Sequence, residues 1–383
     1  SSSSSSSSSS SQSKSVVHSV HIYPIKSCGG IHLTEHGARW ELTDVGLAYD
    51  REWAIVVPSP SVTASSSATE VWRVLRQKDC SRMCMVCTRM DWKDRCLVVS
   101  APEMEEKDEL DEDVVFGELR IPLHPLRHRQ RQNHPSSHGD NKRDDGAVVE
   151  KGEKGRDATN AKTIDLINCG HRCRDLRIGD LFGSTEASKK ADRWFSRVLG
   201  RVCRLVRVPQ DHSTPLRGAG AENIGFSNEK QLLLINMASV ENLQQRLTSF
   251  RASTKVVAPM VTHLSFRPNV VVSRLPAFEE NGWASGMRVH MSFGGRRLGD
   301  TGGLAEMSNP CIRCSMINRD PHTGKVIPDV LQVLSTYQKS GSAVRFGRYL
   351  SVVSSVEQDD ASGRAGARVK REFVVGSSLV LAS

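Results

Sequence analysis

The sequence feature that most constrains the fold is a series of short runs rich in valine, isoleucine and leucine, separated by polar stretches and turn residues. Runs of this length and composition predict β-strands, whereas apolar residues recur at helical spacing in few places. The uneven spacing favours a mainly β fold with some helices (α+β, with β-barrel-like domains) over a doubly wound parallel sheet. Strands are expected at 16–25, 52–57, 83–87, 96–99, 201–208, 232–235, 270–273 and 373–381, with a further short strand within 114–122; helices are expected at 189–199, 239–247 (capped by Ser239) and 330–334.

Three segments cannot contribute to a packed core. Residues 1–11 are all serine, which is typical of a flexible linker, and we expect this linker to cover 1–15. A linker at this place indicates that the sequence is the C-terminal portion of a longer protein. Residues 58–70 are rich in small polar residues, and 101–161 form an acidic block followed by a basic, histidine-rich one, so both are expected to be disordered insertions. These segments explain why only 38% of the residues are hydrophobic.

The net charge of +9 says little about a partner. Arg127, Arg129 and Arg131 belong to the basic block, but no interleaved aromatic residues or zinc-finger spacing accompany them. We therefore expect a charged surface insertion and no specific nucleic-acid partner. No run of about 20 apolar residues is present, so no membrane span or membrane partner is expected.

The ten cysteines suggest a reducing compartment, because the chain is long and carries no visible secretory signal. We therefore expect a cytoplasmic protein with free thiols. Cys84 and Cys87 lie in a strand-like run, in which residues three apart point to opposite faces, so buried cysteines are favoured over a zinc site shared with a second Cys-x-x-Cys pair. Cys169 and Cys173, with the histidine between them, form a weaker candidate for a metal site.

The second pair, Cys311 and Cys314, lies in a different context. Asn309 and Pro310 precede it and indicate an irregular loop. Arg313 directly before Cys314 favours the thiolate electrostatically, and a loop thiolate suits redox chemistry or a transition metal.

Several separate motifs together resemble one known family, the MOSC proteins, which bind the molybdenum cofactor. They are Tyr-Pro-Ile-Lys-Ser-Cys at 23–28, Gly-Leu-Ala-Tyr-Asp-Arg-Glu-Trp at 46–53, Phe-Arg-Pro-Asn at 266–269, Pro-Cys-Ile-Arg-Cys at 310–314 and Asp-Pro-His-Thr-Gly at 320–324. Further matches at 226–239, 277–283, 314–318, 346–350 and 374–377 resemble the C-terminal portion of eukaryotic molybdenum cofactor sulfurases.

The resemblance implies two domains after the linker. Residues 16–205 would form the MOSC N-terminal β-barrel-like domain, interrupted by the insertion at about 101–161, and residues 206–383 would form the MOSC domain. The cofactor would be Mo-molybdopterin, whose phosphate needs cations and whose pterin needs hydrogen-bonding partners.

Candidate site residues follow from these motifs. Lys26 and Arg51 offer cations for the phosphate, and Ser27 adds a hydroxyl. Arg267 and Asn269 lie two apart on an expected strand, so their side chains would face the pterin together. By resemblance, Cys314 is the catalytic residue and molybdenum ligand, and Arg313 supports its thiolate or the phosphate. Cys311 is expected to be a bystander, and Cys28 and Cys203 are expected in the core.

In function, the resemblance implies a protein that binds the molybdenum cofactor and presents it for sulfuration, as the C-terminal part of a sulfurtransferase. Pyridoxal phosphate would belong only to a cysteine desulfurase domain, acting upstream in cis or in trans, and molybdenum hydroxylase apoenzymes would receive the sulfurated cofactor. The alternative is a stand-alone molybdenum-dependent MOSC reductase of N-hydroxylated compounds. Amidoxime reduction by this chain alone would favour that alternative.

Overall fold

The fold is taken from a computed structural model, which describes residues 15–59, 71–102, 117–123, 163–168, 171–177, 185–208, 224–227, 229–255, 257–298, 303–353 and 371–382. None of the helices in these ranges is both long and apolar enough to cross a membrane.

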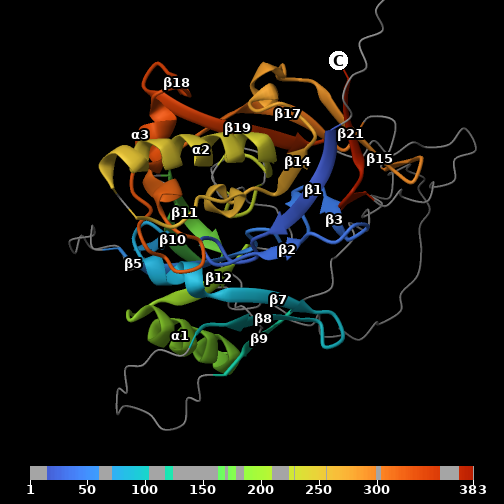
Figure 1. The fold of residues 1–383 in the computed structure, drawn as a ribbon. Helices are drawn as coiled ribbons and strands as arrows, with labels where there is room; N and C mark the ends of the chain where they lie inside the picture. The colour runs from blue at the N-terminus through green and yellow to red at the C-terminus, as the bar shows by residue number, and fades with distance from the viewer. Residues whose placement is uncertain are drawn as a thin grey trace, which may run out of the picture.

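The largest element is a closed seven-stranded β-barrel, seen in the upper half of Figure 1. The first and last of these seven strands pair with each other, which closes the barrel. Among the pairs that form the barrel, β13–β14 is parallel and the others are antiparallel. The order is β13 (Leu232–Asn236), β14 (Val270–Ser273), β1 (Ser15–Ile22), β21 (Ser378–Ala382), β15 (Arg288–Phe293), β17 (Ala305–Ile312) and β19 (Ala343–Val352). The short strands β2 (Ile31–Leu33), β16 (Arg296–Leu298) and β18 (Lys339–Ser340) extend β1, β15 and β19.

Valines and leucines of alternate strand positions fill the barrel. Val20, Leu234, Val270 and Leu350 are each fully buried in this core. Alternation along a strand sends every second side chain inward, so short β-branched runs suffice to build it. The first strand of the chain thus completes a barrel made otherwise of strands from the second half.

Two helices cover one side of the barrel and enclose a second core (Figure 1). They are α2 (Met237–Thr254) and α3 (Val330–Ser335), accompanied by the single-turn 3₁₀ helices η2 (His263–Phe266), η3 (Glu279–Gly282) and η4 (Ser315–Asn318). The predicted cap is wrong, because α2 is capped by Asn236, whose side chain accepts from the Ala238 N–H at 3.1 Å. Ser239 instead donates to the buried carboxylate of Glu280 at 2.7 Å.

The middle and lower parts of Figure 1 contain two smaller sheets and a helix. One sheet has the order β11 (His171–Arg177), β10 (Thr163–Asn168), β6 (Val71–Val74), β5 (Trp53–Pro58) and β12 (Arg204–Arg207), and the other β7 (Cys87–Asp91), β8 (Cys96–Ser100) and β9 (Leu119–Pro122). Helix α1 (Thr185–Leu199) and the 3₁₀ helix η1 (Ser81–Met85) pack with them. A third small sheet joins β20 (Glu372–Val374), β3 (Arg39–Thr43) and β4 (Gly46–Leu47).

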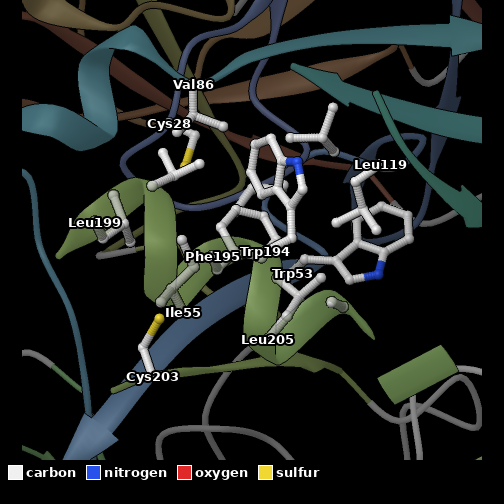
Figure 2. Close-up of a cluster of buried hydrophobic side chains, with 14 of the residues drawn as sticks. Cys28, Trp53, Ile55, Val86, Leu119, Trp194, Phe195, Leu199, Cys203 and Leu205 are labelled. Atoms are coloured by element: carbon white, nitrogen blue, oxygen red, sulfur yellow. The ribbon is translucent and has the colours of Figure 1, made fainter. Parts of the chain in front are cut away.

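This half has its own apolar core, shown in Figure 2. Trp53 and Phe195 are completely buried there, and the thiols of Cys28 and Cys203 lie among the apolar side chains. The prediction that these two cysteines belong to the core is therefore confirmed.

The predicted fold class is confirmed: the structure is mostly β, with few helices and a barrel. Two predicted boundaries are wrong. Residues 83–87 are not a strand, since Cys84 lies in η1 and Cys87 begins β7, and residues 373–381 form two strands. The short strand predicted within 114–122 is confirmed as β9. Gly376 separates β20 from β21, with φ +88° and the His36 ring so close that a Cβ would clash with it.

Candidate functional site

Three of the residues predicted for the site have left-handed backbone conformations. The φ angles are 71° for Ser27, 48° for Arg51 and 54° for Arg267. A non-glycine residue in this region costs about 1–3 kcal/mol and persists where the surroundings fix it, often at functional sites. Here the Arg51 N–H donates to the Tyr23 carbonyl at 2.8 Å, and the Arg51 carbonyl accepts from the Phe226 N–H at 3.0 Å. These tight turns bring segments 23–28, 49–53 and 266–269 together.

Arg51 connects the first half of the chain to the second. Its guanidinium pairs with Asp50 and donates to Asn269 Oδ1 at 2.8 Å and to the Arg267 carbonyl at 3.2 Å. It also lies 4.9 Å from the centre of the Tyr23 ring. Arg51 is therefore held in place by four contacts, and Asp50 neutralises its charge.

Arg267 lies on the same tyrosine and has no carboxylate partner among the described residues. Its guanidinium is 4.2 Å from the Tyr23 ring centre, and Nη1 donates to the Cys28 carbonyl at 2.7 Å. Nη2 is buried without a hydrogen-bond partner in the described part of the chain, and the same holds for the Tyr23 hydroxyl. Burial lowers the pKa of Arg267 and raises that of Tyr23 to about 12, so the tyrosine stays neutral.

Arg313 shows the same pattern, with its guanidinium over the ring of Phe266. Nε donates to the Phe346 carbonyl at 2.9 Å, Nη1 donates to the Phe266 carbonyl at 3.3 Å, and the guanidinium lies 5.2 Å from the Phe266 ring centre. Its Nη2 is also buried with no partner among the described residues. Gly347 lies beside it: its φ is +76°, and an added Cβ would lie 3.5 Å from Arg313 Nη2 and only 2.6 Å from the Leu234 carbonyl oxygen, so the position requires glycine.

The cysteine loop follows the end of β17. Cys314 is exposed, and its carbonyl accepts from the Ile317 N–H at the start of η4. Cys311, three residues earlier, is buried, and burial raises the pKa of its thiol. The two thiols therefore differ, since only Cys314 is accessible to a reagent or ligand.

A second turn supports this loop. The Asp320 carboxylate accepts from the backbone N–H groups of His322 and Thr323 at 2.8 and 2.9 Å. Gly324, with φ +67°, approaches η1 so closely that an added Cβ would lie 2.8 Å from the Ser81 carbonyl oxygen. The Asp-Pro-His-Thr-Gly motif thus packs closely against η1, which belongs to the first half of the chain.

Lys26 and Ser27 are both buried beside these residues. The Lys26 ammonium donates to the Phe226 carbonyl at 2.6 Å, and its backbone N–H donates to the Trp53 carbonyl at 2.8 Å. Because the Phe226 N–H donates to the Arg51 carbonyl, Phe226 links Lys26 to Arg51. We define the arginine cluster as Arg51, Arg267 and Arg313.

Asn269 is placed differently from the prediction. Arg267 is the C-cap of η2 and β14 begins only at Val270, so the expected common strand face of Arg267 and Asn269 is wrong. The Asn269 amide is buried and fully used: Nδ2 donates to the His21 carbonyl at 3.2 Å and to Asp50 at 3.0 Å. Its Oδ1 accepts from the Leu233 N–H at 3.1 Å and from Arg51. Asn269 thus joins β1 to β13 and holds the Asp50–Arg51 pair.

Three histidines beside the cluster were not predicted. His21 Nδ1 and His32 Nδ1 share a hydrogen bond of 2.7 Å, His21 Nε2 contacts Ser19 Oγ at 2.7 Å, and the His263 ring lies 5.0 Å from that of His21. Burial lowers the pKa of His21 to about 2 and those of His32 and His263 to about 4. All three are neutral at pH 7. The only sequence signal was the placement of Ser19 and His21 at alternate positions of a predicted strand.

Cys84 and Cys87 do not form the two-thiol half of a zinc site. Cys84 is buried and accepts from the Gln77 amide, whereas Cys87 is exposed. Among the described residues, no group of three or more histidine, cysteine or acidic side chains is arranged to hold a metal ion. Cys169 lies outside the described residues, as does the side chain of Cys173.

Chemically, the arrangement suits an anion. Among the described residues, three guanidinium groups lie here with the Lys26 ammonium, and the carboxylate of Asp50 pairs with Arg51. Two guanidinium N–H groups remain without partners in the described structure, and a buried donor left unpaired costs about 1–3 kcal/mol. An anionic ligand would satisfy these donors, and the exposed thiol of Cys314 follows directly on Arg313.

Comparison with known proteins identifies two domains in the chain. Residues 14–116 match the model of the MOSC N-terminal beta barrel domain, and residues 221–369 match that of the MOSC domain. The chain is 29% identical over 342 residues to a molybdenum cofactor sulfurase of Solanum lycopersicum, 26% over 345 residues to that of Bos taurus and 25% over 346 residues to that of Homo sapiens.

These matches cover 86%, 88% and 88% of the chain but only 32%, 30% and 30% of the relatives, so the chain spans about a third of their length. Both domains occur in the order that the motifs predict, within the fold described above. The chain therefore belongs to the MOSC-domain proteins, and its homologues are molybdenum cofactor sulfurases.

Proposed function

We propose that the chain binds the molybdenum cofactor and presents it for sulfuration, as the C-terminal part of a molybdenum cofactor sulfurase. The observation that carries this proposal is the pair of buried, unpartnered guanidinium N–H groups of Arg267 and Arg313, next to the exposed thiol of Cys314. Cationic donors suit a phosphate, and a thiolate suits molybdenum as a soft ligand.

The residues present fit such a ligand. Arg267 and Arg313 would donate to its anionic groups, and Lys26 and Ser27 would add a charge and a hydroxyl on the side of the first half of the chain. The chemistry that the bound cofactor would supply is an oxo-molybdenum centre able to take a terminal sulfur ligand. Cys314 would lie at the molybdenum, and Cys311, buried in the core behind it, would take no part.

Arg51 and Asn269 have more specific roles in this proposal. The fixed fork of Arg51 would face the ligand, while Asp50 and Asn269 keep it in orientation. Because all hydrogen-bonding groups of the Asn269 amide are used internally, Asn269 would act through Arg51 and not by touching the pterin.

Sulfuration also needs a sulfur donor. We propose that a pyridoxal-phosphate-dependent cysteine desulfurase domain supplies it, in cis or in trans, and that molybdenum hydroxylase apoenzymes receive the product. The names of the relatives, and the third of their length that the chain spans, support this assignment. A cytoplasmic location remains a prediction from the free thiols.

Two variants test the proposal. The chain is incubated anaerobically with Mo-molybdopterin and thiol reductant, freed of excess ligand, and assayed for bound molybdenum and pterin. Arg267→Met should reduce the retained pterin at least tenfold, whereas Arg207→Met removes a guanidinium that is paired with Glu52 at 2.7 Å and should leave retention unchanged. Equal retention by both variants would refute the assignment. Amidoxime reduction by the unmodified chain alone would favour the reductase instead.

A further inference from the structure

Tyr23 contacts two members of the arginine cluster through one aromatic ring. The guanidinium of Arg267 lies 4.2 Å from the ring centre, and that of Arg51 lies 4.9 Å from it. Both distances fall within the range of about 6 Å over which the face of an aromatic ring attracts a cation. One side chain is thus shared by two cations, of which one belongs to the first half of the chain and the other to the second.

The two guanidinium groups gain from a shared contact because their charges repel each other. Asp50 pairs with Arg51, whereas no carboxylate of the described residues pairs with Arg267. Burial lowers the pKa of Arg267, and the neighbouring charge of Arg51 lowers it further. Besides the ring, the described contact of the Arg267 guanidinium is the Cys28 carbonyl, which accepts from Nη1 at 2.7 Å. Without the ring of Tyr23, one hydrogen bond would remain, about which the group could turn.

The Tyr23 ring is itself fixed by the surrounding backbone. The Tyr23 N–H donates to Asp50 Oδ1 at 2.7 Å, and the Tyr23 carbonyl accepts from the Arg51 N–H at 2.8 Å. Gly30 lies against the edge of the ring: an added Cβ would lie 2.7 Å from Tyr23 Cε1 and 2.9 Å from the Ile22 carbonyl oxygen. Only 2% of Tyr23 is exposed. A ring held in this way can set the direction of the groups that pack on it.

The hydroxyl of Tyr23 does not explain this arrangement. It is buried without a hydrogen-bond partner among the described residues, and burial keeps the phenol neutral by raising its pKa to about 12. A neutral phenol attracts a guanidinium through the negative face of its ring. The contact therefore depends on the ring, which Tyr23→Phe keeps and Tyr23→Leu removes.

We infer that Tyr23 is a positioning residue of the candidate site: its ring holds the guanidinium groups of Arg51 and Arg267 in fixed directions toward an anionic ligand. The inference rests on the proposed cofactor site, because it concerns the direction of two donors of that site. Arginine side chains lose much rotamer freedom when a ligand orders them. The ring accounts for part of that ordering before the ligand binds, so its loss weakens binding without removing a donor.

Nuclear magnetic resonance of the ligand-free full chain, with isotope-labelled arginine, measures the direction of the two side chains. Protons above the face of an aromatic ring resonate upfield, and Arg51→Met and Arg267→Met assign the signals. The Hδ and Hε signals of both arginines should lie upfield of those of exposed arginines in the unmodified chain and in Tyr23→Phe. Both sets should return to the ordinary range in Tyr23→Leu.

Pterin retention after anaerobic reconstitution is then compared among the same variants. Tyr23→Leu should retain about tenfold less pterin than the unmodified chain, whereas Tyr23→Phe should retain a normal amount. Tyr337→Leu is the matched control, because the Arg246 guanidinium lies 4.2 Å from the centre of the Tyr337 ring and the Tyr337 hydroxyl is likewise buried without a partner in the described structure. This variant should shift the Arg246 signals and leave retention unchanged.

Several results would overturn the inference: ordinary signals of Arg51 and Arg267 in the unmodified chain, unchanged retention in Tyr23→Leu, or an equal loss of retention in Tyr23→Phe, which would assign the effect to the hydroxyl. If Tyr23→Leu does not fold, Tyr23→Met takes its place, since its flexible side chain has no aromatic face. No retention by the unmodified chain would contradict the proposed function instead. The signals of the ligand-free chain would still show whether the ring orients the two arginines.

Discussion

The buried amide of Asn269 offers a direct measure of how firmly the site is built. We consider Asn269→Leu, a change to an apolar side chain of similar size. The variant loses four hydrogen bonds: from the Leu233 N–H, from Arg51, to the His21 carbonyl and to Asp50. The backbone of Asn269 remains bonded to Leu233 and His21 at 2.8 Å on either side, so the loss is confined to the amide.

The magnitude follows from these contacts. A typical net hydrogen bond contributes about 0.5–1.5 kcal/mol, one to a charged group about 1.5–3, and a buried group left unpaired costs about 1–3. Two of the four bonds involve the charged Asp50–Arg51 pair. We therefore expect Asn269→Leu to lower the free energy of unfolding by about 4 kcal/mol, a large share of the 5–15 kcal/mol of an average domain.

Urea unfolding followed by circular dichroism measures this change. The m-value should stay constant, so that the midpoint shift reports stability alone. Cofactor retention should fall as well, because Arg51 loses its fixed orientation. Ser196→Ala serves as a control: it removes hydrogen bonds to Cys203 in the other core, so it should lower stability without changing retention. A loss below about 1 kcal/mol in Asn269→Leu would refute the account of this residue.

Two further predictions concern the barrel around the site. The pKa of His21 is 6.5 in the unfolded chain but about 2 in the folded protein. Below pH 6.5 the unfolded state therefore binds a proton that the folded state does not, so lowering the pH to 5 should reduce the free energy of unfolding by about 2 kcal/mol. Urea unfolding at pH 7.5 and 5 should show a smaller pH-dependent loss in His21→Gln, and an identical loss would contradict the buried, neutral state of His21. In thermal unfolding, Gly347→Ala should lower the free energy of unfolding by at least about 2 kcal/mol more than Gly295→Ala. Both glycines have a positive φ, but only at Gly347 would the added Cβ lie 2.6 Å from a backbone oxygen. Equal losses in the two variants would show that this close approach is absent.

Most of the helices and strands could be predicted from the sequence, but few of the contacts between them could. Strands such as β13 and β14 were predicted from uninterrupted runs of valine, isoleucine and leucine, because these residue types are enriched in buried strands. The strand predicted over residues 83–87 was wrong, since a five-residue apolar run does not distinguish a strand from a 3₁₀ turn. Between β20 and β21, a Cβ at position 376 would clash with the ring of His36. His36 is distant in sequence, so no local pattern indicates that this position requires glycine.

For the candidate site, too, the sequence predicted the residues but not their contacts. Motifs identified Lys26, Arg51, Arg267 and Arg313 as candidates, and the structure brings these four residues together. The left-handed backbone of Arg267, and the engagement of Asn269 with β1 and β13, depend on long-range partners that no local pattern reveals. The histidines beside the cluster were missed because a neutral, buried histidine leaves the same sequence signal as any other strand residue.

The central claim is that the exposed thiol of Cys314 holds the molybdenum of a bound cofactor. The most direct test is the molybdenum content of the chain after anaerobic reconstitution with Mo-molybdopterin, compared between Cys314→Ser and Cys311→Ser. We expect the unmodified chain and Cys311→Ser to retain molybdenum and pterin together, and Cys314→Ser to lose at least nine-tenths of the molybdenum. If the unmodified chain retains neither molybdenum nor pterin, or if Cys314→Ser retains as much molybdenum as Cys311→Ser, the claim is contradicted.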